Sequence, residues 1–318
     1  MRSNISSLHS RPSNYLLQGA RDDPLLLKEW VLVMRGDGKS PQTIEGYTDS
    51  VRQLSAFLKE RGFLPPEQAT AEHLREWLNQ LRDKGNRPAT VNTRYRGAHA
   101  FYRWLVREGE IKENPLDRID PPRVPEAVQP HYTPAELQVI LKALRGRRLR
   151  GVDAHRMQAI ILLLFDCGLR SSELCALQIR DVSWDNQAII VRQTKGGDQR
   201  VVSLGTTATR SALAYLRARN LESPWLFTTL DGTRLTRNAL KLGLRRAFEA
   251  AQVQFRGVHA FRRASGIAYL QQGGQAEDLR VLMGWRSPEM VRRYVRAAEA
   301  ERAVAAHKMF SPADHLEA

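Results

Sequence analysis

The chain has 318 residues, 42% hydrophobic and 26% charged, which is enough for two domains with cores of their own. Lys and Arg (49) outnumber Asp and Glu (34), and residues 121–318 hold +12 of the net charge of +15, so a folded basic half is expected to face a polyanion such as nucleic acid. The longest apolar run, residues 159–165, is too short to span a bilayer, and the polar residues 1–15 show no secretory signal. The two cysteines, Cys167 and Cys175, make neither a disulfide framework nor a zinc site.

The first part of the chain has the pattern of a small helical domain. Residues 1–21 are polar and without apolar periodicity, and we expect a flexible N-terminal arm there. In residues 22–112, apolar side chains recur at steps of three and four residues, which is typical of amphipathic helices. The predicted helices cover residues 25–34, 40–62, 70–85 and 88–109.

The second part is expected to be mainly α with a small antiparallel β-sheet. A proline-rich segment, residues 113–132, is the predicted linker, and a capping box beginning at Thr133 opens a second domain, residues 133–306. Two β-prone runs, 188–193 and 200–204, flank a turn that contains Lys195 and predict a hairpin. The predicted helices of this domain cover residues 134–146, 153–167, 206–219, 237–252, 258–272, 276–284 and 288–305, and residues 307–318 form a predicted tail.

One motif with chemical potential lies where an apolar helix ends. Phosphodiesters can be exchanged without a metal ion when cations hold the non-bridging oxygens, a nucleophile attacks and an acid protonates the leaving oxygen. After Cys167-Gly168, Arg170 begins the next element, and Glu173 follows three residues on, where its carboxylate can orient the guanidinium. Taken alone, this pattern is equally typical of an ordinary surface arginine at the start of a helix.

Two further motifs follow towards the C-terminus. In His259-Ala260-Phe261-Arg262, the histidine and the arginine share one helical face. A lone histidine at a helix start is more often a satisfied structural residue than a catalytic one. The third motif is Gly284-Trp285 followed by Tyr294, a tyrosine flanked by arginines, which is also expected on an amphipathic helix whose phenol reaches past its cationic neighbours.

Together these motifs resemble, in order and content, the tyrosine recombinase (phage integrase) family. The order is Arg-x-x-Glu, a lysine in a hairpin turn, His-x-x-Arg, Gly-Trp and then a tyrosine. The resemblance covers nearly the whole chain, because residues 22–112 are similar to the helical core-DNA-binding domain of that family and residues 133–306 to its catalytic domain.

The resemblance implies a site-specific DNA recombinase that uses neither ATP nor a metal or other cofactor. Tyr294 would attack the scissile phosphate, form a 3′-phosphotyrosyl link and release a 5′-hydroxyl. Arg170 and Arg262 would hold the non-bridging oxygens, and Lys195 would protonate the leaving oxygen. The supporting roles implied are proton transfer or a phosphate hydrogen bond for His259, an indole N–H donated to the phosphate by Trp285, and support of Arg170 by Glu173.

Two positions depart from the usual pattern of the family. Trp285 stands where most members have histidine, so no proton can be transferred from that position, and Arg263 stands where histidine is frequent. These departures favour an integrase of a phage or other mobile element over a chromosome-dimer resolvase, and a transposon-borne recombinase stays open. Two readings outside the class are also open: a type IB topoisomerase and a non-catalytic helical DNA-binding regulator.

The implied partners are double-stranded DNA with specific recombination sites and three further copies of the chain, which form a homotetramer on two DNA sites. By analogy with the family, the N-terminal helices 40–62 and 88–109 cross the major groove. An accessory or directionality factor is compatible with this assembly, and the expected location is the cytoplasm, at the bacterial nucleoid. The candidate DNA-binding residues, each equally expected on the solvated face of a small bundle, are Lys39, Gln42, Thr43, Arg87, Thr90, Asn92, Thr93, Arg94 and Arg96.

Overall fold

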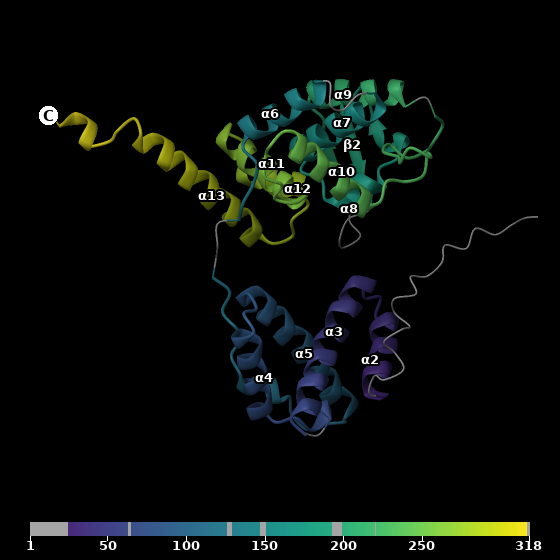
Figure 1. Ribbon diagram of the computed structural model, residues 1–318, viewed down its shortest axis with the longest axis vertical. Coiled ribbons are helices and arrows are strands. Elements are labelled where there is room, and N and C mark those ends of the chain that lie inside the picture. The colour runs from purple at the N-terminus through teal and green to yellow at the C-terminus, as the bar shows by residue number, and fades with distance from the viewer. Residues whose placement is uncertain are drawn as a thin grey trace, which may run out of the picture. The chain divides into compact units, whose positions relative to one another are not determined.

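The chain forms two compact units, Met1–Ala127 (unit 1) and Val128–Ala318 (unit 2), shown in Figure 1. The predicted arm, residues 1–21, and Lys195 lie outside the residues that the structure describes. Among the helices of the described ranges, none has both the length and the apolar character needed to cross a membrane. The computed structural model describes residues 25–62, 65–125, 129–146, 151–192, 199–219 and 221–316.

The described part of unit 1 is a bundle of four helices, which confirms the four predicted ones. Ser40 caps the second of them by accepting a hydrogen bond from the Thr43 backbone N–H, and Pro41 at the first helical position presets φ for the helix. The helices are α2 (Leu25–Gly36), α3 (Pro41–Glu60), α4 (Ala71–Asp83) and α5 (Pro88–Glu108), with 3-10 turns η1 (Pro66–Gln68) and η2 (Pro115–Arg118).

Aromatic side chains fill the core of unit 1 and hold α3 against α5. Trp30 of α2 stacks on Tyr47 of α3 and packs on Phe101 of α5, with ring centroids 6.0 and 5.2 Å away. Gly97 of α5 allows the two backbones to come close, because a Cβ there would stand 2.5 Å from the Oγ of Ser50 on α3. The two helices that carry the candidate DNA-binding residues are therefore packed directly against each other.

The proline-rich segment contributes to both cores. Leu116 in η2 is fully buried in unit 1, and Tyr132 is fully buried in unit 2. The Tyr95 hydroxyl also donates to the Ile119 carbonyl at 2.9 Å, which holds the segment to α5. The predicted linker, residues 113–132, thus includes side chains that the units need for their own packing.

Unit 2 is mostly helical, as the sequence predicts. The sequence misses one helix, α8, because six residues are too few to show a helical period. The predicted tail, residues 307–318, contains a 3-10 turn, η4 (Ala313–His315). The helices are α6 (Pro134–Arg145), α7 (Val152–Cys167), α8 (Ser171–Ala176), α9 (Thr206–Ala218), α10 (Arg237–Ala250), α11 (His259–Gln271), α12 (Ala276–Met283) and α13 (Pro288–His307).

A small antiparallel sheet in the order β1-β2-β3 completes unit 2. The predicted hairpin is confirmed as β2 (Ala188–Val191) and β3 (Arg200–Ser203), and β1 (Val182–Ser183) is an additional short strand. Ile189 pairs with Val202 on the buried face. Because side chains alternate along a strand, Arg200 lies on the same face of β3 as Val202.

Helix α11 joins two apolar clusters of unit 2. Its first half contributes Phe261 to the main core around the central helix α7, and Ile267 in its second half belongs to a smaller cluster. The smaller cluster is built by α11, α12 and α13 and includes Leu279, Met283, Trp285, Val291, Tyr294 and Ala298. The candidate site lies along α11 where the two clusters meet.

Helix α13 runs outward from the rest of unit 2 and carries the last turn of the chain at its outer end (Figure 1). Large apolar side chains in this region are between 65% and 75% exposed, namely those of Val304, Met309, Phe310 and Leu316.

Candidate active site

The turn that ends α7 places Arg170. Gly168 takes a left-handed conformation, with φ at 57°, which closes the helix. The Glu173 carboxylate then accepts a hydrogen bond from the backbone N–H of Arg170 at 2.8 Å and one from its Nη1 at 2.7 Å. The carboxylate fixes the position of the guanidinium, whose side chain is 26% exposed.

Glu173 is a buried carboxylate shared by two arginines. Arg200 on β3 forks onto it, with Nη1 2.9 Å from Oε1 and Nη2 2.7 Å from Oε2. Burial alone would raise the pKa of Glu173, but hydrogen bonds from Arg200 and Arg170 and the charge of Arg200 outweigh it and lower the pKa to about 2. The carboxylate therefore stays ionised over the whole physiological pH range.

Arg262 in the first turn of α11 joins the ends of two other helices. Its Nη1 donates to the Gly168 carbonyl at 2.7 Å, and its Nη2 donates to the Met283 carbonyl at the end of α12. Carbonyls at helix C-termini lack helical partners and carry a negative dipole, so they favour a cation. Burial, followed by repulsion from Arg170, lowers the pKa of Arg262 to about 10, and the side chain remains charged at neutral pH.

Trp285 and Tyr294 face each other beside Arg262. Gly284, left-handed with φ at 61°, ends α12 and turns the chain so that the Trp285 side chain is buried. The Arg262 Cζ lies 5.5 Å from the centre of the indole ring. The indole and phenol rings have centroids 4.5 Å apart at an angle of 42°.

Tyr294 is a buried residue on a helix with exposed arginines. It is 7% exposed, whereas Arg292 and Arg296 on the same helix have side chains 73% and 58% exposed. Its ring lies on Gly266 of α11, where a Cβ would stand 2.6 Å from the phenol Cδ1. The packing therefore excludes the alternative in which the phenol reaches past its cationic neighbours to water.

The two candidate proton-transfer groups are both held in their neutral forms. Partial burial and then the charges of three arginines lower the pKa of His259, the first residue of α11, below its ordinary 6.5. Burial raises the pKa of Tyr294, and the same arginines offset only part of that rise. A neutral imidazole and a neutral phenol thus share a cationic environment made by Arg262, Arg263 and Arg170.

Of the residues predicted for the catalytic site, all but Lys195 lie in the described residues of unit 2. Arg170 lies at the N-terminus of α8 and Glu173 on α8 itself. His259 and Arg262 lie on α11, Trp285 follows α12, and Tyr294 lies on α13. Lys195 falls in residues 193–198, outside the described residues. In the described part of the chain, no group of three His, Cys, Asp or Glu side chains is arranged to hold a metal ion.

Sequence reasoning missed two residues of this site, Arg200 and Gly266. A signal for the first was present, because an arginine on the inward face of a β-strand needs a buried acceptor. The second carries no local signal, since a glycine inside a helix can be explained in several ways until its neighbour on another helix is known.

The nine candidate DNA-binding residues of unit 1 divide by their surroundings. The Arg94 guanidinium is paired with Asp49 at 2.5 Å, and the Asn92 amide donates to the Pro122 carbonyl at 2.8 Å. The hydroxyls of Thr43 and Thr93 also have partners within the unit, and Thr90 is half-buried. The remaining four are exposed, namely Lys39, Gln42, Arg87 and Arg96.

Comparison with known sequences places the chain in a family. The sequence model of the phage integrase family matches residues 131–301, more than half of the chain. This chain belongs to the phage integrase family. The N-terminal SAM-like domain of phage integrases also matches, over residues 26–111. Both matches agree with the resemblance that the motifs carry, and the family is confirmed.

Curated relatives bear the name tyrosine recombinase. The chain is 30% identical to tyrosine recombinase XerA of Pyrococcus horikoshii over 202 residues, which are 64% of this chain and 64% of the relative. It is 30% identical to XerA of Thermococcus kodakarensis over 263 residues, 81% of this chain and 86% of the relative. With XerC of Chromobacterium violaceum the identity is 29% over 254 residues, 78% of this chain and 81% of the relative.

Solved structures share the fold at lower identity. XerH bound to a palindromic difH substrate matches with a TM-score of 0.71 and 18% identity, over 88% of this chain and 83% of that one. The Tn1549 transposon integrase with circular intermediate DNA matches with a TM-score of 0.69 and 19% identity, over 87% and 99% of the two chains. The mainly α fold with a small antiparallel sheet is therefore the fold of these recombinases.

Proposed function

We propose that the protein is a site-specific DNA recombinase that cuts and rejoins DNA through Tyr294. The observation that carries the proposal is the contact of Tyr294 with Trp285 beside the Arg262 guanidinium, in a buried site that Arg170 borders. A neutral phenol held among cations is suited to attack an anionic phosphodiester.

In this reaction the Tyr294 oxygen attacks the scissile phosphorus, the bond to the 5′-oxygen breaks, and a 3′-phosphotyrosyl ester forms. The phenol proton passes to a base, for which the neutral His259 imidazole is the candidate. Lys195 would give a proton to the leaving 5′-oxygen. One phosphodiester replaces another ester, so the link can be reversed by a 5′-hydroxyl without a nucleotide energy source.

The two arginines would serve the phosphate differently. Arg170, with a side chain 26% exposed, offers its outer edge to the non-bridging oxygens. Arg262 already donates to the carbonyls of Gly168 and Met283, so its remaining N–H groups would complete the clamp. Charge that develops on the phosphate would then meet donors that are held in place before the reaction begins.

Unit 1 would read the DNA. Lambda integrase, whose solved structure shares this fold, is bound there to a core site. The exposed candidates, which lie on α3 and α5 or just before these helices, would contact phosphates and base edges. Arg94 and Asn92 would instead support the helices, through their contacts with Asp49 and Pro122. A DNA substrate would place the protein at the nucleoid.

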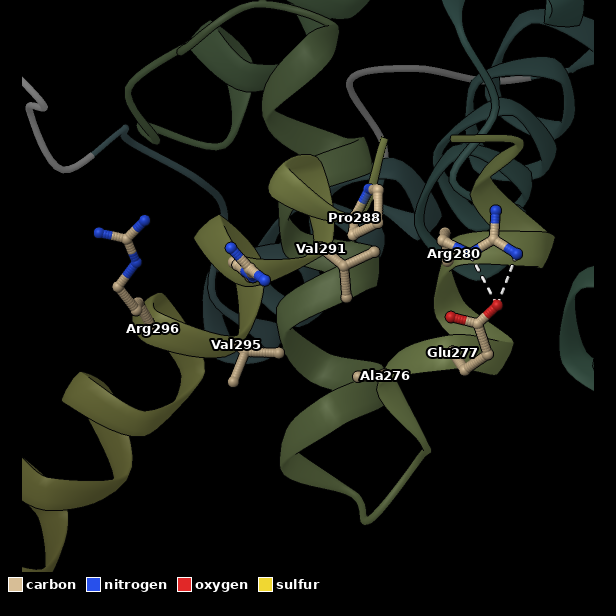
Figure 2. A pocket seen from close by; sticks show the side chains of 8 residues that line it. Ala276, Glu277, Arg280, Pro288, Val291, Val295 and Arg296 are labelled. Atoms are coloured by element: carbon tan, nitrogen blue, oxygen red, sulfur yellow. Dashed lines mark hydrogen bonds and ion pairs between the residues drawn. The ribbon is translucent and has the colours of Figure 1, made fainter. Parts of the chain in front are cut away.

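Assembly into a homotetramer on two DNA sites is the proposed active form. A groove of about 500 Å³ lies between α12 and α13, and Figure 2 shows Val291 and Val295 directed into it and Arg296 beside it. The exposed apolar side chains at the outer end of α13, such as Phe310, would match such a groove on a neighbouring copy. This match supports contacts between copies through α13.

An integrase of a phage or other mobile element is our preferred identity, and a chromosome-dimer resolvase is the alternative. Trp285 and Arg263 at the two histidine positions support the first, and the XerA and XerC names of the curated relatives support the second. Both carry out the same cleavage chemistry and differ in their DNA sites and in their accessory factors.

The test is covalent trapping in cells. Protein is denatured rapidly and recovered, and the DNA attached to it is sequenced, with Tyr294→Phe in parallel. The phenylalanine variant lacks only the attacking oxygen, so it should keep its affinity for DNA and lose all attached DNA.

The sequences recovered distinguish the candidate functions. One defined short site, absent from the variant, would support a site-specific recombinase, and its position in a mobile element or near the replication terminus would identify which kind. Adducts scattered over the genome would indicate a type IB topoisomerase. No adduct in cells, together with no cleavage of a nicked duplex by the purified chain, would leave a DNA-binding regulator.

A further inference from the structure

Arg200 is a buried arginine that none of the motifs includes. It is the first residue of β3, and its side chain is 7% exposed. Its guanidinium donates to both carboxylate oxygens of Glu173, and its Nε donates to the Leu282 carbonyl at 2.9 Å. Since each of its nitrogens has an acceptor, burial leaves the side chain one stable position.

The bond to Glu173 connects Arg200 with the candidate phosphate site. Glu173 Oε1 accepts from Arg200 at 2.9 Å and from Arg170 Nη1 at 2.7 Å, so one oxygen lies between two guanidinium groups. Any movement of the carboxylate would therefore move Arg170. A carboxylate held only by Arg170 would lose the bidentate fork that fixes its plane.

The bond to Leu282 connects Arg200 with the turn that presents Trp285. The next carbonyl, that of Met283, is held by Arg262. The Arg200 side chain also packs against Gly284, where a Cβ would stand 3.0 Å from its Cδ. Two arginines thus hold successive carbonyls of one turn.

We propose that Arg200 is a positioning residue for DNA cleavage, because through Glu173 and the end of α12 it sets the distance between the Arg170 guanidinium and the Trp285 turn. This inference rests on the proposed function. The proposal assigns Arg200 no contact with the phosphate, because its Nη1 and Nη2 are directed at Glu173 and its Nε at the Leu282 carbonyl. Its effect on the reaction is carried by Arg170 and Trp285.

Lysine is the informative replacement. A lysine ammonium keeps the positive charge, but it cannot fork onto two carboxylate oxygens and reach a carbonyl on another segment at once. Arg200→Lys therefore retains the positive charge of the site and removes the forked contact with Glu173 and the simultaneous bond to the Leu282 carbonyl. Arg219→Lys is the matched control, because Arg219 is similarly buried and donates to three carbonyls, those of Ser223, Trp225 and Leu226, outside the site.

The experiment measures single-turnover formation of the covalent complex on two nicked duplexes built on the trapped site. One duplex has the normal scissile phosphodiester. The other has a methylphosphonate there, which lacks the negative charge that Arg170 would hold. Affinity for intact duplex and the unfolding temperature are measured for each variant.

Arg200→Lys should slow cleavage of the phosphodiester by about 10–100-fold, the loss expected from a displacement on the order of 1 Å. It should slow cleavage of the methylphosphonate much less and leave duplex affinity unchanged. Arg219→Lys should lower the unfolding temperature and slow neither reaction. This pattern would support a positioning role, because a general loss of stability affects both duplexes equally.

Equal slowing on both duplexes, or slowing no greater than that of Arg219→Lys, would overturn the inference while the proposed function stands. If the wild-type chain forms no covalent complex, the proposed function fails and the inference falls with it. Should Arg200→Lys not fold, Glu173→Gln takes its place, because it removes the charge that Arg200 grips at nearly constant volume, and the same contrast between duplexes is required of it.

Discussion

The position of the Tyr294 ring depends on a glycine, Gly266, on the neighbouring helix α11. The ring occupies the space above Gly266, so the proposed nucleophile and α11 are in direct contact. Any Cβ at this position competes with the phenol ring for that space.

Gly266→Ala should therefore displace Tyr294 and destabilise unit 2 by about 1–3 kcal/mol, as expected for overpacking. Formation of the covalent complex should fall with it, measured on a nicked duplex together with thermal unfolding. Gly243→Ala on α10 is the matched control, because its Cβ would meet the flexible end of Met157 at 3.2 Å. A Gly266→Ala protein as stable and as active as the control would contradict the packing argument.

The depressed pKa of His259 gives a second prediction for a single residue. The residue accepts a proton only when it is neutral, and its pKa lies below 6.5 because of partial burial and neighbouring arginines. The second-order rate constant for cleavage should hold from pH 8 down to about 6.5 and fall below it, as the imidazole of the free enzyme becomes protonated. His259→Gln should remove this acid limb and lower the plateau.

The control for this pH profile is His99→Gln in unit 1, where the histidine pairs with Asp117 at 2.9 Å. It should leave the profile unchanged. An acid limb that persists in His259→Gln would assign the titration to another group.

At the scale of the helices, Arg262 connects α11 with the ends of α7 and α12, because it donates hydrogen bonds to the carbonyls of Gly168 and Met283. Arg262→Lys leaves one of these buried carbonyls without its donor, which should lower the free energy of unfolding by about 1–3 kcal/mol. It should also slow cleavage by about 10²–10³-fold, the loss typical of a removed transition-state donor.

Arg263→Lys is the neighbouring control for Arg262→Lys. Arg263 donates to the Pro130 carbonyl at an exposed site, so its replacement should change the free energy of unfolding by less than about 1 kcal/mol. Denaturant unfolding and single-turnover cleavage measure both variants. Equal stability of the two would show that the carbonyl contacts of Arg262 contribute little.

The helices themselves could be predicted from the sequence, whereas the side-chain contacts that connect them could not. The apolar periodicity of α3 or α5 is a local property of the sequence, and so are caps such as Ser40-Pro41. The motif order predicted the family, which is confirmed. It also predicted six candidate site residues among those that the structure describes, and their roles remain a proposal. The inward position of Arg200 on its strand signalled a buried acceptor, but its partners could not be predicted, because Glu173 and Leu282 lie 27 and 82 residues away.

For the whole molecule, charge and the proposed substrate together give a prediction. If the protein neutralises about 6–10 phosphates, duplex affinity should fall by about 10³–10⁵-fold between 50 and 200 mM salt. Fluorescence anisotropy at several salt concentrations measures the slope. A nearly flat dependence would contradict DNA binding through the basic surface.

A variant pair on α5 tests whether Arg96, near the middle of the helix, contributes to DNA binding. Arg96→Gln, at an exposed candidate position, should reduce the salt slope by about one phosphate contact. Arg107→Gln is the control in the last turn of the helix, where the arginine pairs with its neighbour Glu108. Equal slopes for both variants would remove Arg96 from the proposed interface.

Three arginines of unit 2 leave the site with a net positive charge. Arg170, Arg200 and Arg262 gather around the single carboxylate of Glu173, and repulsion between them contributes to the lowered pKa of Arg262. A DNA phosphate bound at this site, as the proposed function requires, would offset part of the repulsion between these arginines. If the protein binds DNA there, the free protein is the less stable form, and resistance to heat and proteolysis should be greatest for DNA-bound molecules.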